Sequence, residues 1–149
     1  MSKKPAVAWV IVVLAAFALL SDALDTLLGI IGVGRRPIRE SLGTVMLCAP
    51  FAAASVLVIR GILRRTFRSR APVSLYLWAL LIAEPIANVL RSVGWYLPAP
   101  EIADEELAGA AFAELMRFAI LLALIVWTGS SKALKKYFAG AAPAPVSVG

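Results

Sequence analysis

The chain has 149 residues and a net charge of +6; 61% of its residues are hydrophobic, only 16% are charged, and the mean hydropathy is +0.87. Soluble globular domains do not reach this apolar content, so the composition predicts an all-α integral membrane protein, a single four-helix bundle. Histidine is absent and Cys48 is the one cysteine, which removes the usual general base and the usual metal ligands. We therefore expect a protein that is not an enzyme and that carries no cofactor or metal.

The first predicted span covers residues 6–30, which follow a short basic start. Its first part, the apolar run at residues 6–20, also fits a signal peptide, and Ser21-Asp22-Ala23 offers small residues at the spacing of a cleavage site. Apolar residues resume directly after Asp25, however, and acidic residues beside a cleavage site are unusual. We favour a retained helix over a cleaved leader.

Three further apolar segments are long enough to cross a bilayer. They comprise residues 44–63, 73–97 and 108–128. Pro50 lies within the first of them and predicts a kink there, because proline cannot donate the backbone hydrogen bond of a regular helix. Together with the first span they make residues 1–138 one membrane domain.

The connecting segments differ in composition. Residues 34–43 contain glycine and proline and are predicted to form a loop, residues 64–72 are strongly basic, and residues 98–107 are acidic and proline-rich. A short amphipathic helix is expected at residues 131–138. The small and proline-rich residues 139–149 predict a disordered tail.

The Lys and Arg residues predict the orientation in the membrane, because cytoplasmic loops carry an excess of them. One side of the membrane would hold four basic residues, and the other side would hold ten. The four are Arg35, Arg36, Arg39 and Arg91. Those ten are Lys3, Lys4, Arg60, Arg64, Arg65, Arg68, Arg70, Lys132, Lys135 and Lys136. Both termini are therefore expected in the cytoplasm, where the last eight of the ten would contact anionic lipid headgroups. Because the basic residues flank apolar segments, no nucleic-acid partner is expected.

The third span carries polar residues in the middle of its apolar sequence. Glu84, Asn88 and Arg91 are spaced at i, i+4 and i+7 and therefore share one helix face. An ionised side chain in hydrocarbon is costly unless it faces protein, so this face is expected to turn toward partners on other helices.

Depth in the membrane predicts which partners those are. Glu84 lies about 17 Å from the inner edge, and Arg117, on a helix that enters from outside, lies about 14 Å from the outer edge, so the two meet at one depth. Glu114 precedes Arg117 by one turn on the same face. By the same argument Arg91 is expected to pair with Asp22 or Asp25.

Two interpretations of this intramembrane polar cluster stay open. It either holds structural ion pairs that fix the register of the helices, or it lines an outward-opening cavity that binds a cation, a proton or a polar ligand. Asp22 with Asp25 as a catalytic dyad is disfavoured, because the motifs of intramembrane aspartate proteases are missing. The cluster comprises Asp22, Asp25, Glu84, Asn88, Arg91, Glu114 and Arg117.

The C-terminal sequence resembles that of a known family. The matching residues are Arg117 in the last span and then Ser131, Lys132, Lys135 and Phe138. This C-terminal pattern resembles the end of the sequences of the DUF2569 family, whose members are small bacterial four-helix membrane proteins. The chain departs from that pattern at three positions, where it has Leu124, Trp127 and Ala133. The resemblance implies a divergent member with four spans in the bacterial inner membrane. It implies no activity and no catalytic residue.

These observations predict an accessory or interaction subunit, whose partners are the bilayer and another membrane protein or a second copy. Small residues at 109–113 and 48–52 are suited to close helix packing, within the bundle or between copies. The alternative is a small transporter or ligand-binding bundle that uses the acidic residues of the polar cluster. The sequence shows no internal repeat of the kind on which many transporter folds are built.

Overall fold

The computed structural model describes residues 4–33, 37–96, 98 and 104–140. Between 104 and 110 it describes the backbone, and it gives the exposure of Gly109 alone. The described residues form five helices: α1 (Ala6–Ile31), α2 (Ile38–Leu63), α3 (Ala71–Ser92), α4 (Asp104–Ser130) and α5 (Lys132–Ala139). Four of them, with α4 counted over Ala111–Ser130, are long and apolar enough to cross a membrane. The chain is an all-α, multi-pass membrane protein, as its composition predicts.

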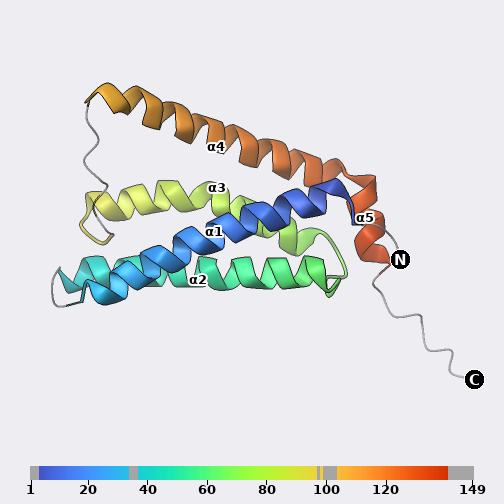
Figure 1. Ribbon diagram of the computed structural model, residues 1–149, viewed down its shortest axis with the longest axis horizontal. Helices are drawn as coiled ribbons and strands as arrows, with labels where there is room; N and C mark the ends of the chain where they lie inside the picture. Colours follow the sequence, from blue (N-terminus) through green and yellow to red (C-terminus); the bar gives the residue numbers. More distant parts are fainter. Residues whose placement is uncertain (1–3, 34–36, 97, 99–103, 141–149) are drawn as a thin grey trace, which may run out of the picture.

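The four long helices form two pairs. α1 packs mainly along α2, and α3 packs mainly along α4. Figure 1 shows that α4 leans away from the other helices toward its N-terminal end, whereas its C-terminal end and α5 lie near the start of α1. We call the end with α5 and the α2–α3 connection the basic end, and the other the opposite end.

The second helix is longer than predicted, because α2 begins at Ile38 instead of residue 44. The loop prediction for residues 34–43 is therefore wrong for its second half. Pro37 ends the connection, and its carbonyl oxygen accepts the backbone N–H groups of Glu40 at 3.0 Å and Ser41 at 3.4 Å. Glu40 in the first turn also complements the positive end of the helix dipole. The charged first turn thus extends an apolar helix past the predicted span.

The third helix is shorter than predicted, because α3 ends at Ser92 instead of residue 97. Gly94 has a φ of +70°, a left-handed conformation that favours glycine. The N–H of Trp95 then bonds to the carbonyl oxygen of Leu90 at 2.7 Å, which turns the chain back toward the bundle. The turn lies so close to α2 that a Cβ on Gly43 would come within 1.7 Å of the Trp95 carbonyl oxygen.

The basic end holds the main apolar core, to which all five helices contribute. Its most deeply buried large side chains include Ile11, Ile62, Leu77, Leu134 and Phe138. α5 is capped by the Ser131 hydroxyl, which accepts the Leu134 N–H at 3.1 Å. The amphipathic helix predicted at 131–138 is therefore confirmed at Lys132–Ala139. Most of the predicted tail, residues 141–149, lies outside the described residues.

α5 closes the basic end of the bundle. The Tyr137 hydroxyl donates to the carbonyl oxygen of Ile62 at 2.8 Å, and Phe138 lies edge-on to Phe67 with ring centroids 6.2 Å apart. Arg65 stacks over the Tyr137 ring, 4.3 Å from its centroid. Arg70 donates to the Gly129 carbonyl oxygen at the C-terminal end of α4. Two of the eight predicted headgroup residues thus contact protein. The other six are exposed: Arg60, Arg64, Arg68, Lys132, Lys135 and Lys136.

Candidate functional site

A cavity of about 530 Å³ lies among α1, α2, α3 and α4, in the part of the bundle away from α5. Its lining includes six members of the predicted polar cluster, all except Asn88, together with apolar side chains from all four helices. Asn88 lines a smaller hollow beside α3 and α4, which also reaches Glu84, Glu114 and Arg117. The structure therefore brings the predicted cluster together around a hollow instead of a close-packed interior.

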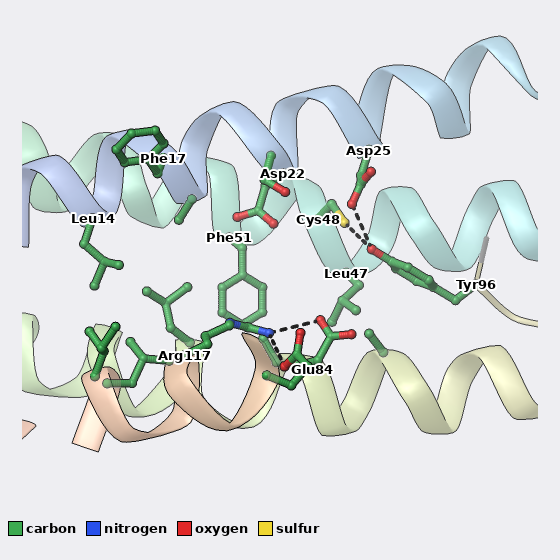
Figure 2. A pocket seen from close by; sticks show the side chains of 18 of the residues that line it. Leu14, Phe17, Asp22, Asp25, Leu47, Cys48, Phe51, Glu84, Tyr96 and Arg117 are labelled. Carbon is green, nitrogen blue, oxygen red and sulfur yellow. Dashed lines mark hydrogen bonds and ion pairs between the residues drawn. The ribbon is translucent and has the colours of Figure 1, made fainter. Parts of the chain in front are cut away.

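Glu84 is the centre of the ion pairs on the α3 and α4 side. Its carboxylate accepts Nη1 of Arg117 at 3.4 Å, which is the pairing that the depth argument predicts (Figure 2). It also accepts Nη1 of Arg91 at 2.8 Å. Arg117 makes a second bridge to Glu114 at 3.3 Å, three residues away on α4. Two arginines thus share two glutamates.

Arg91 does not form the pairing predicted for it. Its Nη1 donates to Glu84 and, at 2.6 Å, to Asn88, both on its own helix, instead of to Asp22 or Asp25 on α1. The i, i+4, i+7 spacing explains the difference, because the long side chain at the end of α3 folds back along one helix face. Its Nε is buried and has no hydrogen-bond partner among the described residues.

The two aspartates of α1 lie across the cavity from these pairs. Asp25 accepts a hydrogen bond from the Tyr96 hydroxyl at 3.3 Å. Asp22 points into the cavity (Figure 2), and its Oδ2 is buried with no hydrogen-bond partner among the described residues. The described residues place no lysine or arginine within ion-pair distance of either carboxylate.

Tyr96 and Cys48 line the site, although the sequence did not place them there. Trp95 and Tyr96 end the third predicted span, and such aromatic residues are typical of a membrane interface. The turn at Gly94 instead carries Tyr96 into the bundle, where it is 6% exposed. Its hydroxyl lies 3.1 Å from the Cys48 Sγ, and Arg91 stacks over its ring. Burial raises the pKa of the Tyr96 phenol above its ordinary value, so the phenol stays protonated and can donate to Asp25. The sequence feature that could have indicated this turn is Gly94.

No protein-family model, no curated protein and no solved structure matches this chain. The resemblance to the DUF2569 family therefore stays a prediction from the C-terminal motif.

The α4 side is the least closed wall of the cavity. Residues 111–116 of α4 are all exposed, and Leu121 is the first buried side chain that the structure describes on this helix. This agrees with the lean of α4 away from its neighbours (Figure 1). The other walls are largely apolar, with Phe51 lying between Asp22 and the Glu84 pairs (Figure 2).

The donor set does not resemble a metal centre. Among the described residues there is no group of three or more His, Cys, Asp or Glu side chains that could hold a metal ion. The cavity instead combines two carboxylates that form no ion pair with any residue the structure describes, a buried guanidinium donor, and aromatic and aliphatic walls. Such a combination is suited to binding a small molecule with a charged group and an apolar body.

Proposed function

We propose that this protein is a non-enzymatic bundle that binds a small ligand inside the membrane, as a carrier or as the binding subunit of a larger assembly. The observation that carries the proposal is the cavity of about 530 Å³ into which Asp22 points, with no ion pair to Asp22 among the described residues. Ligand sites in proteins typically occupy about 300–1,000 Å³ and pair apolar walls with a few polar groups.

Structural ion pairing accounts for only part of the polar cluster. It explains Glu84, Arg91, Glu114 and Arg117, which neutralise one another. It does not explain the aspartates of α1, because neither forms an ion pair among the described residues and an ionisable group without a counter-charge is costly in a membrane interior. A site that receives a ligand accounts for both sets, since the pairs hold the walls and the aspartates contact the ligand.

An accessory or interaction subunit is the second candidate function. It is favoured by the N-terminal half of α4, where residues 111–116 are all exposed. A partner protein or a second copy could pack there, because small residues such as Gly109 and Ala113 allow helices to approach closely. A partner packed there would cover the least closed wall of the cavity, because Glu114 and Arg117 of α4 line it.

We further propose the bacterial inner membrane as the location, with both termini in the cytoplasm. The exposed arginines and lysines of the basic end support this orientation, because positive residues accumulate on the cytoplasmic side. Anionic headgroups would neutralise them there. The cavity would then lie in the outer half of the membrane.

Co-purification tests the proposal and separates the two candidates. The full chain would be purified from native membrane in mild detergent and examined by native mass spectrometry, beside Ala18→Phe, which fills the cavity, and Ala16→Phe, which places the same side chain on the exposed face of α1. We expect a bound small molecule in the wild type and in Ala16→Phe that is lost in Ala18→Phe. A stoichiometric protein partner with no small molecule in any of the three would contradict the binding function and support the accessory role.

A further inference from the structure

We infer that the ligand is an organic cation that bears an ammonium group and an oxygen acceptor, an inference that rests on the proposed function. A free amino alcohol and the headgroup of a zwitterionic phospholipid share this chemistry. The inference is drawn from the charges of the cavity, its walls and two unpartnered polar atoms.

The charge distribution leaves the α1 side of the cavity more negative than the α3 and α4 side. Arg117 bridges both Glu84 and Glu114, and Arg91 bridges Glu84, so the two guanidinium groups are matched by two carboxylates. Among the described residues no lysine or arginine forms an ion pair with the Asp22 or Asp25 carboxylate, and Arg117 acts on Asp22 only from beyond ion-pair distance. Their side of the cavity therefore carries excess negative charge, which a ligand cation would neutralise.

The walls favour an organic cation over a metal ion. Calcium takes six to eight oxygen ligands, and magnesium takes six in a strict octahedron. The part of the chain that the structure describes offers no cluster of three acidic or metal-ligating side chains. Aromatic rings of Phe17 and Phe51 line the cavity instead, and such rings attract alkylated ammonium groups through the negative charge of their faces.

The oxygen acceptor of the ligand is inferred from Arg91. Its charge is neutralised by Glu84, yet its Nε–H is buried with no partner among the described residues, and the residue lines the cavity. A buried donor without an acceptor is costly, so we expect the Arg91 side chain to turn its Nε–H toward a ligand oxygen when the cavity is occupied. The Asp22 carboxylate thus favours a positive group on the ligand, and the Arg91 guanidinium favours an oxygen acceptor on it.

Choline is the probe that tests this inference, because its uncharged isostere 3,3-dimethyl-1-butanol has the same shape. The melting temperature of the purified full chain would be measured with choline chloride, with the isostere, and with sodium chloride at equal ionic strength. At roughly tenfold excess over its dissociation constant, choline should raise the melting temperature by about 3–5 °C. Neither the isostere nor sodium should do so.

Two variants assign the effect to the cavity. Asp22→Asn should abolish the choline shift, whereas Glu40→Gln removes one negative charge from α2 outside the cavity and should keep it. Nanodiscs distinguish the two sources of the ligand. If the headgroup is the natural ligand, phosphatidylcholine should stabilise the wild type relative to phosphatidylglycerol, and Asp22→Asn should remove the difference.

Each remaining outcome decides against the inference. An equal shift with the isostere or with sodium overturns the ammonium assignment, as does a choline shift that survives in Asp22→Asn. The inference is also overturned if neither choline nor phosphatidylcholine raises the melting temperature. In that case, a small molecule that is bound by the wild type and lost in Ala18→Phe would support the binding function with a different class of ligand. If mass spectrometry detects no such molecule, both the inference and the proposed binding function are wrong.

Discussion

Glu84→Gln should lower the free energy of unfolding by about 2–3 kcal/mol, the largest loss expected from any single charge change in the site. The substitution removes the carboxylate that accepts both Arg91 and Arg117 and leaves two guanidinium groups short of a counter-charge. Breaking a buried pair costs about 3–5 kcal/mol, whereas exposed pairs contribute at most about 1 kcal/mol. Glu84 is 30% exposed, which places the expected loss between these limits. Thermal unfolding in detergent measures it.

A double-mutant cycle determines how much of that loss belongs to the contact with Arg117. Glu84→Gln combined with Arg117→Leu should recover part of the loss, because the second change removes one of the two stranded charges. Glu114→Gln is the matched control, since its side chain is 60% exposed and its bridge should contribute less than about 1 kcal/mol. Strictly additive losses in the cycle would mean that Glu84 and Arg117 are not coupled.

Gly43→Ala should destabilise the fold by about 2–3 kcal/mol although it adds only one methyl group. The new Cβ would lie 1.7 Å from the Trp95 carbonyl oxygen, so the backbone turn that carries Tyr96 has to move. That movement would withdraw Tyr96 from the cavity and uncover Cys48, which is 3% exposed and the one cysteine in the chain. Faster alkylation of Cys48 by a small thiol reagent, together with a lower melting temperature, checks the result.

The matched controls for Gly43 are the glycines of α4. A Cβ at Gly109 or Gly129 would meet no atom within 4 Å, so alanine there should be neutral or stabilise by up to about 1 kcal/mol through helix propensity. Neither substitution should change the alkylation of Cys48. Equal behaviour of Gly43→Ala and Gly109→Ala would show that the Trp95 turn does not rest against α2.

The sequence was sufficient for the features that depend on one helix or on depth. Apolar length predicts the four spans, and the rise per residue predicts that Glu84 and Arg117 meet. The amphipathic pattern after Ser131 predicts α5. These properties follow from local composition and from the thickness of the bilayer, so no tertiary information is needed to derive them.

The features that depend on a backbone turn could not be derived in this way. The helix face shared by Glu84, Asn88 and Arg91 is visible in the sequence, but the choice of Arg91 between its own helix and α1 depends on the spacing of the helices. Tyr96 lies in the cavity because Gly94 reverses the chain and Gly43 leaves room for the turn. That contact joins α2 to the turn after α3, and no local pattern encodes it.

The central claim is that the intramembrane acids line a cavity that water and small polar molecules reach from outside the cell. Single cysteines in a Cys48→Ser background test it most directly, at Asp22, which lines the cavity, and at Leu20 and Leu24, which lie near it on exposed faces of α1. Intact cells would be treated with a small, charged, membrane-impermeant thiol reagent. We expect labelling of Asp22→Cys and none of Leu20→Cys or Leu24→Cys, because only the cavity admits a charged reagent at that depth. Absence of labelling at all three positions, or equal labelling at all three, would contradict the account.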